Sequence, residues 1–164
     1  MLPQDIEAAA EAVIGRAKAA GVMVAAAESC TGGLVSGALT AIAGSSAVLD
    51  RGFVTYSNEA KVEMLGVPED VLARFGAVSE PTARAMAEGA VARSRASVAV
   101  SVTGIAGPGG GSTDKPVGLV HFAAVGADDR TVHLEKRFGD IGREAIRLES
   151  VRTALSLLLE AVSR

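Results

Sequence analysis

A hydroxyl and a thiol stand side by side in a polar segment, ESCTGG at 28–33. An apolar run at 22–27 precedes it and an amphipathic stretch follows, so the pattern predicts a buried strand, a tight turn and a helix. Backbone N–H groups at such a junction bind anions and oxyanions. Ser29 or Cys30 could therefore be the nucleophile of an acyl-transfer reaction. The alternative is a helix cap, in which Ser29 or Thr31 only satisfies the first N–H groups of the helix.

A second candidate segment follows the next expected strand, at 48–56. Tyr56 ends that strand, Asn58 is expected to cap a short helix at 59–65, and Lys61 falls near the start of this helix. A helix N-terminus disfavours a cation, which would help Lys61 act as a neutral base. To do so near pH 7 its pKa must fall by about three units, or about 4 kcal/mol. The alternative is an ordinary surface lysine beside a plain sheet tyrosine.

A glycine-rich loop follows Thr103, with five glycines among the eight residues 104–111. Such a loop lets the backbone approach a ligand closely and aim N–H groups at an anion. It is neither a P-loop nor a dinucleotide fingerprint, because no Gly-Lys-Ser/Thr follows and it leads into a strand. A flexible connector is the alternative. Arg143 and Arg147, one turn apart on the last expected helix, could clamp a phosphate or carboxylate, or could only be solvated.

The elements that would position these residues alternate along the chain. Hydrophobic periodicity predicts helices at 4–20, 33–43, 59–65, 68–75, 79–94 and 142–162, and strands at 22–27, 48–56, 97–103, 117–125 and 131–138. This order predicts an α/β fold, a three-layer α/β/α sandwich with a five-stranded mixed sheet, in one domain over 1–164. His121 is expected in the core or on the sheet and His133 on an exposed face, and neither has partners at metal-ligand spacing.

Composition restricts the possible partners and location. A net charge of −3 gives no electrostatic reason to expect a nucleic acid or an anionic membrane as partner. A single cysteine excludes an internal disulfide and suits a reducing cytoplasm. The sequence contains no recognisable signal peptide and no apolar run of the ~20 residues that a membrane span needs. We therefore expect a soluble cytoplasmic protein.

Together these segments resemble the CinA C-terminal domain family, the nicotinamide-nucleotide amidohydrolases, in its stand-alone form. The matching stretches cover nearly the whole chain and lie at 27–67, which contains AESCTGG and YSNEAK, at 102–123, VTGIAGPGGGSTDKPVGLVHFA, and at 142–147, GREAIR. The resemblance implies hydrolysis of nicotinamide mononucleotide to nicotinate mononucleotide and ammonia. It implies no metal and no cofactor, a homodimer, and an α/β/α sandwich with five strands. The larger family members carry a further N-terminal domain.

The resemblance also implies roles for individual residues. Ser29 would be the nucleophile, with Cys30 as its rival, Lys61 the base, and Tyr56 a proton relay or the group that orients Lys61. Segment 138–143 is one residue longer than the family's usual Phe-x-Gly-Asp-Arg. The alternative function is a non-catalytic nucleotide-binding or regulatory module linked to competence or DNA damage. Substrate contacts are expected from Glu28, Thr31, Gly32, Gly33, Asn58, Thr103, Gly104, Gly107, Gly109, Gly110, Gly111 and Arg143.

Overall fold

Five strands form one mixed sheet in this computed structural model, which describes residues 1–164. The strand order is β2-β1-β3-β4-β5. Strand β1 pairs in parallel with both β2 and β3, whereas β4 is antiparallel to both β3 and β5. The strands are β1 (Val24–Glu28), β2 (Leu49–Val54), β3 (Val98–Gly104), β4 (Leu119–Val125) and β5 (Thr131–Arg137).

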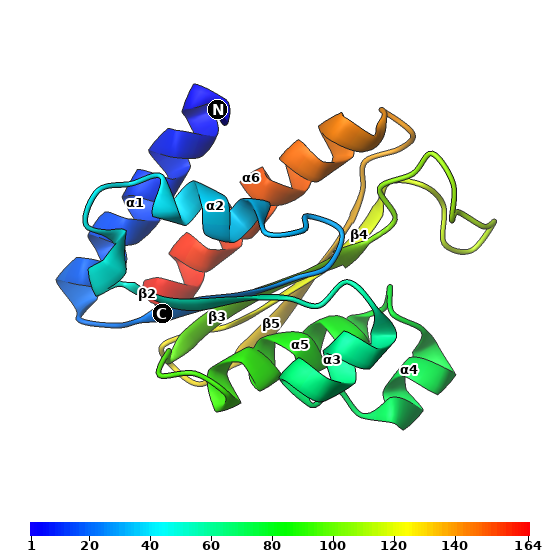
Figure 1. Cartoon of the computed structure of the whole chain (residues 1–164), viewed down its shortest axis with the longest axis horizontal. Coiled ribbons are helices and arrows are strands. Elements are labelled where there is room, and N and C mark those ends of the chain that lie inside the picture. Colours follow the sequence, from blue (N-terminus) through cyan, green and yellow to red (C-terminus); the bar gives the residue numbers. More distant parts are fainter.

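Helices cover both faces of this sheet (Figure 1). Helices α1, α2 and α6 lie on one face and α3, α4 and α5 on the other. The expected three-layer sandwich with a five-stranded mixed sheet is thereby confirmed. None of the helices combines the length and the apolar character needed to cross a membrane. The helices are α1 (Gln4–Ala20), α2 (Leu34–Thr40), α3 (Asn58–Leu65), α4 (Glu69–Phe75), α5 (Glu80–Ala92) and α6 (Arg143–Val162), with a 3-10 turn at Ser45–Ala47.

Small side chains let the layers approach closely. All five residues of β1 are buried, and three of them are consecutive alanines, 25–27. A strand covered on both faces has no reason to alternate apolar and polar residues, which explains this continuous run. On the α5 side, Gly89 packs directly against the backbone carbonyl of Leu65, where any side chain would clash. This contact brings α5 against the end of α3 and holds α3 over the sheet.

Two local predictions are wrong. Asn58 does not cap α3; the preceding Ser57 does, because its hydroxyl accepts from the N–H of Ala60 at 3.0 Å. His133 does not lie on an exposed face, because α5 covers that face of the sheet. Its Nε2 atom lies 2.8 Å from Nδ1 of His121, and its Nδ1 lies 3.5 Å from a carboxylate oxygen of Glu80 on α5.

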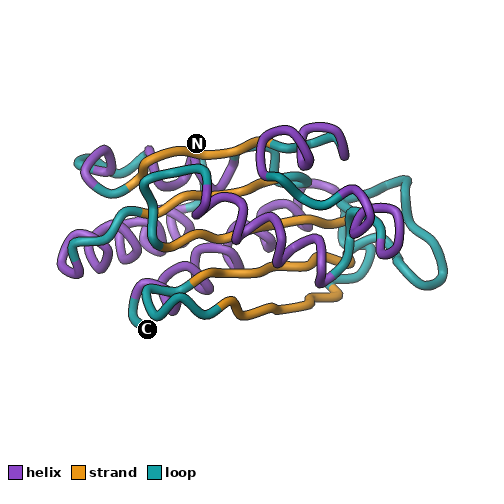
Figure 2. Tube along the Cα trace, turned by 90° about the horizontal axis from the view of Figure 1, so that it is seen from below, coloured by secondary structure: helices purple, strands orange, loops and turns teal.

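Three chain segments meet at one end of the sheet. Because β1, β2 and β3 are parallel, their carboxyl ends face the same way and the loops that follow them converge there. These loops are 29–33, 55–57 and 105–118. In Figures 1 and 2 the long loop between β3 and β4 projects from this end. The sheet topology thus gathers the polar segments singled out in the sequence.

Candidate active site

The side chain of Lys61 reaches Ser29 inside the protein. Its Nζ lies 3.0 Å from the Oγ of Ser29, 2.8 Å from the carbonyl oxygen of Thr55 and 3.4 Å from that of Tyr56. Lys61 extends from α3 into the space between the loops after β1 and β2, and only 1% of its surface is exposed. Ser29 is 8% exposed. An amine and a hydroxyl at this distance can exchange a proton.

Burial changes the acidity of Lys61. Removing the ammonium group from water disfavours its charged form, so the pKa of Lys61 lies below its ordinary value. No carboxylate lies within ion-pair distance of Nζ to restore the charge. The alternative of an ordinary surface lysine is wrong, because Lys61 is buried and its amine contacts a hydroxyl.

Glu28 caps helix α2. Its carboxylate is fully buried and accepts four hydrogen bonds, two on each oxygen. One oxygen accepts from the Thr31 hydroxyl at 2.7 Å and the Val35 N–H at 2.8 Å. The other accepts from the N–H of Ser36 at 3.0 Å and its hydroxyl at 2.8 Å. The alternative of a helix cap by Ser29 or Thr31 is wrong, because Glu28 accepts from these helix N–H groups.

The free N–H groups lie in the turn and not in the helix. The N–H groups of Ser29 and Gly32 are used, donating to the carbonyls of Val102 and Ser29 at 3.0 Å. Those of Cys30, Thr31 and Gly33 donate to no group of the protein. In the first turn of the helix, the N–H groups of Val35 and Ser36 already donate to Glu28. Only the turn retains donors for an oxyanion.

Cys30 is a poor nucleophile where it lies. Burial raises the pKa of its thiol to about 12, which leaves almost no thiolate at neutral pH. The thiol also makes no hydrogen bond to Lys61, whose Nζ instead contacts the Ser29 hydroxyl. Between these neighbours, the contact with a base favours Ser29.

Arg143 links three parts of the site. One of its Nη atoms donates to the carbonyl oxygen of Gly107 at 2.8 Å, and the other lies 3.4 Å from the Tyr56 hydroxyl. The Tyr56 side chain is 64% exposed, and its hydroxyl faces Arg143 rather than Lys61. Arg143 thus joins the start of α6 to the glycine-rich loop and to the loop after β2.

A cavity of about 200 Å³ opens beside Ser29 and Lys61. Of the candidate residues from the sequence, it is lined by Ser29, Cys30, Tyr56, Lys61, Thr103, Gly104 and Arg143. Gly107 is held by Arg143 next to it. Glu28 and Thr31 are fully buried behind the turn. Gly109, Gly110 and Gly111 are exposed at the loop tip, and Asn58 lines a different hollow on α3.

Other lining residues were not foreseen. Ala77 and Val78 complete the wall from the segment before α5, together with Ala106. Nothing in these apolar residue types marks them as a wall of the site. The Thr103 hydroxyl fixes this wall by donating to the carbonyl of Ala77 at 2.8 Å. The Ser79 cap of α5 marks where this segment ends, but not that the segment lines the cavity.

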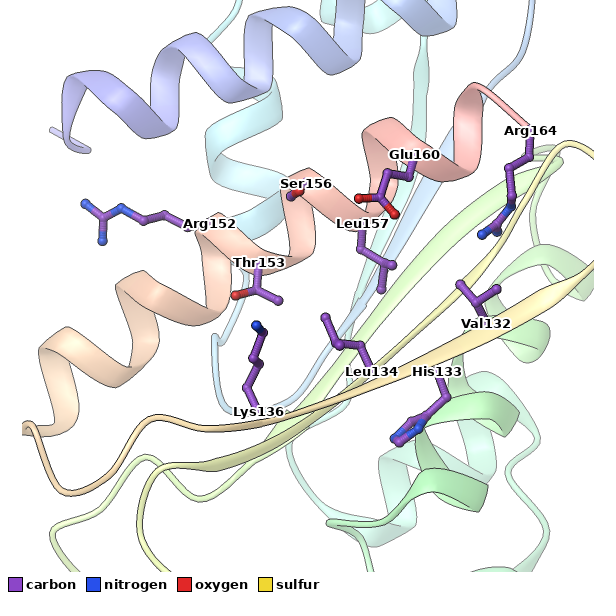
Figure 3. Close-up of a pocket in the computed structure, with 10 residues that line it drawn as sticks. All are labelled: Val132, His133, Leu134, Lys136, Arg152, Thr153, Ser156, Leu157, Glu160 and Arg164. Atoms are coloured by element: carbon purple, nitrogen blue, oxygen red, sulfur yellow. The ribbon is translucent and has the colours of Figure 1, made fainter.

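A larger cavity of about 590 Å³ lies between β5 and α6. Figure 3 shows Leu134 and Lys136 reaching from β5 toward α6, with His133 on the opposite side of the strand. Two of its lining cations are already paired, Arg152 with Asp5 at 2.6 Å and Arg164 with Asp128 at 3.6 Å. It holds no nucleophile in contact with a base. In the whole structure, no group of three or more His, Cys, Asp or Glu side chains could hold a metal ion.

Comparisons with known proteins identify the family of this chain. Residues 6–162 match the family model described as the CinA C-terminal domain. Nicotinamide-nucleotide amidohydrolase PncC of Enterobacter agglomerans is 56% identical over 143 residues, which are 84% of this chain and 86% of that protein. The protein of the same name from Escherichia coli is 53% identical over 147 residues, 88% of each chain.

Further relatives carry names linked to competence and DNA damage. One is known from the crystal structure of competence/damage inducible protein CihA from Agrobacterium tumefaciens, whose sequence is 59% identical. The two structures superpose with a TM-score of 0.96, over 100% of this chain and 99% of that chain. The putative competence-damage inducible protein of Caldicellulosiruptor bescii is 50% identical over 153 residues, and this chain spans 36% of its length. The match covers almost the whole of this chain at high identity, so the chain belongs to the CinA C-terminal domain family.

Proposed function

We propose that this protein hydrolyses the carboxamide of nicotinamide mononucleotide, giving nicotinate mononucleotide and ammonia. The observation that carries the proposal is the buried Lys61 amine, 3.0 Å from the hydroxyl of Ser29 and without a carboxylate partner. The names of the relatives from Enterobacter agglomerans and Escherichia coli support the choice of substrate. Their similarity extends over more than four-fifths of both chains.

In the first half of the reaction, Ser29 Oγ attacks the carboxamide carbon. The serine proton passes to neutral Lys61, whose two N–H bonds point to the carbonyls of Thr55 and Tyr56 and whose lone pair faces Ser29. The carbonyl oxygen becomes an oxyanion, for which the free N–H groups of the turn are the available donors. Collapse of this intermediate breaks the C–N bond. Lys61 returns the proton to the leaving nitrogen, so ammonia departs and an ester on Ser29 remains.

In the second half, water replaces the leaving group. Lys61 takes a proton from the water as the hydroxide adds to the ester carbon, and the same N–H groups hold the oxyanion again. The carbon–Oγ bond then breaks, and Lys61 returns its proton to the serine. The product leaves as a carboxylate with release of one proton. The residues of this chain thus act as nucleophile, base and oxyanion donors, and the scheme uses no metal or cofactor.

The size of the cavity suits one part of the substrate. At about 200 Å³ it is smaller than the about 300–1,000 Å³ that whole small-molecule ligands commonly fill. We therefore place the pyridine carboxamide inside, with the ribose and phosphate at the mouth. Arg143 and the glycine-rich loop stand there, and a guanidinium is well suited to a phosphate. Tyr56, exposed beside Arg143, would contact the same part of the nucleotide.

The test is ammonia release from nicotinamide mononucleotide, with nicotinamide riboside and NAD as comparison substrates. Ser29→Ala and Lys61→Met should each abolish turnover while the far-UV circular dichroism spectrum stays unchanged. Cys30→Ala should keep the wild-type rate, because the Cys30 thiol is protonated at neutral pH. Lys18→Met, at an exposed lysine of α1, is the matched control for loss of a positive charge. Wild-type-like turnover by the Ser29 or Lys61 variant would refute the assignment.

The alternative is a nucleotide-binding or regulatory module without turnover, as the competence-linked names of other relatives allow. Tight binding of nicotinamide mononucleotide by wild-type protein with no ammonia release would favour it. The cytoplasmic location and the homodimer stay predictions. Sedimentation at several protein concentrations tests the dimer.

A further inference from the structure

Arg147 holds the backbone of the turn that carries Ser29. Its Nε donates to the carbonyl oxygen of Cys30 and its Nη2 to that of Thr31, both at 3.1 Å. The guanidinium also lies close over Gly32, where an added Cβ would come within 3.5 Å of Nη2. The planar guanidinium thereby links helix α6 to two consecutive peptide groups of the turn.

From this contact we infer that Arg147 is a positioning residue for the oxyanion site of the proposed amidase. The inference rests on the proposed function and adds a residue to it. In a trans peptide the C=O and the following N–H point in opposite directions. Holding the Cys30 carbonyl toward α6 therefore turns the N–H of Thr31 away from α6. Thr31 itself is fully buried, whereas Cys30, whose carbonyl Arg147 holds and whose own N–H donates to no group of the protein, lines the cavity.

The Thr31 carbonyl, the second one held by Arg147, fixes the next peptide group of the turn. The Thr31 oxygen accepts from Arg147 and from the N–H of Leu34, the first residue of α2. The N–H in that peptide group, on Gly32, is closed back onto the Ser29 carbonyl at 3.0 Å. The turn is therefore tied to α6 on one side and to Ser29 on the other. With both carbonyls fixed, the turn keeps one shape, and the free N–H of Cys30 keeps one place relative to the Ser29 side chain.

The positive charge of Arg147 also favours an oxyanion at the turn. No carboxylate lies within ion-pair distance of its guanidinium, so its positive charge is not cancelled locally. A positive charge fixed against the turn favours the negative charge that develops on an oxyanion beside it. Arg143, one turn earlier, lines the cavity, whereas Arg147 does not. Arg147 thus influences the reacting atoms only through the turn.

The test compares Arg147→Lys and Arg147→Met with the wild-type enzyme. Lysine keeps the positive charge but cannot donate the same pair of hydrogen bonds, and methionine loses both the charge and the hydrogen bonds. A shift of the turn by about 1 Å lowers a rate by about 100-fold, so kcat should fall by about this factor in Arg147→Met and less in Arg147→Lys. KM for nicotinamide mononucleotide should change by less than threefold. Arg152→Met, further along α6 and away from the turn, is the matched control and should keep the wild-type kcat.

An aldehyde analogue distinguishes the positioning of the oxyanion donors from a general loss of structure or of substrate binding. In 3-formylpyridine mononucleotide an aldehyde replaces the carboxamide, and Ser29 Oγ can add to it while its proton passes to Lys61. The resulting hemiacetal oxyanion needs the turn N–H groups, whereas the product nicotinate mononucleotide does not. Affinity for the aldehyde should fall by about the same factor as kcat, while affinity for the product stays within threefold. Melting temperatures are measured alongside, and Arg147→Lys carries the test if Arg147→Met does not fold.

The outcomes distinguish this inference from the proposed function. If the wild-type protein releases no ammonia, the proposed function fails. If it does, and both Arg147 variants keep wild-type kcat and aldehyde affinity, the positioning role is refuted. Equal losses of affinity for the aldehyde and the product would also refute it, because Arg147 would then support binding rather than the oxyanion.

Discussion

Replacing Glu28 by glutamine tests how the turn before α2 is held. The substitution keeps the shape of the side chain but exchanges one acceptor oxygen for an NH₂ donor. Each carboxylate oxygen accepts one backbone N–H and one hydroxyl. The hydroxyls of Thr31 and Ser36 can rotate to accept from the new NH₂, but a backbone N–H cannot. In either orientation of the amide, one N–H, that of Val35 or of Ser36, faces a donor in the interior.

The magnitude follows from these contacts. A buried N–H without a partner is unfavourable by about 1–3 kcal/mol, and the remaining bonds weaken when the acceptor loses its charge. We expect Glu28→Gln to lower the free energy of unfolding by about 3 kcal/mol. For a domain of this length, that corresponds to a fall in melting temperature of about 6–12 °C.

Urea denaturation followed by circular dichroism measures this change, and steady-state kinetics measures KM and kcat. Glu63→Gln, at an exposed residue of α3 with no hydrogen-bond partner, is the matched control and should change stability by less than about 0.5 kcal/mol. The sequence-based expectation that Glu28 contacts substrate makes the opposite prediction, a raised KM at unchanged stability. A loss of less than about 1 kcal/mol in Glu28→Gln would refute the capping argument.

Three further outcomes follow from the buried groups of the site. Because only neutral Lys61 can accept the serine proton, kcat/KM should fall as the pH drops through the lowered pKa of Lys61 and should level off below pH 10.5; a rise that continues to pH 10.5 would contradict the lowered pKa. Between that lowered pKa and 10.5 the unfolded chain binds a proton that the folded protein does not, so wild-type stability should rise with pH in this window, and Lys61→Met should remove this rise in urea titrations at several pH values. The fully buried Oγ1 of Thr55 has no hydrogen-bond partner, so Thr55→Val should raise the free energy of unfolding by about 1 kcal/mol or more. A lower melting temperature for Thr55→Val in thermal denaturation would show that the hydroxyl has a partner.

Much of the architecture was predictable from local patterns. The apolar run through β1 and the 3.6-residue periodicity of α6 indicate a buried strand and an amphipathic helix by themselves, since each depends only on residues close in sequence. Several boundaries shifted by one to three residues, and at the start of α3 the Ser57 side chain decides the boundary. His133 was misplaced because a period-2 pattern cannot tell a solvent-facing surface from one that α5 covers.

The sequence by itself determined the fold class and the residue types available at the carboxyl ends of the parallel strands. Its motifs singled out Ser29 and Lys61, and the family resemblance implied that they act together as nucleophile and base. Spacing alone did not predict their contact, which joins residues 32 positions apart. Only the tertiary structure decided that Lys61 is buried, that Glu28 caps α2, and that Arg147 holds a turn 117 positions away. The physical reason is that helix and strand periodicity is local, whereas desolvation and hydrogen bonding depend on which distant segments pack together. The acidity of a lysine is therefore set by the folded chain around it.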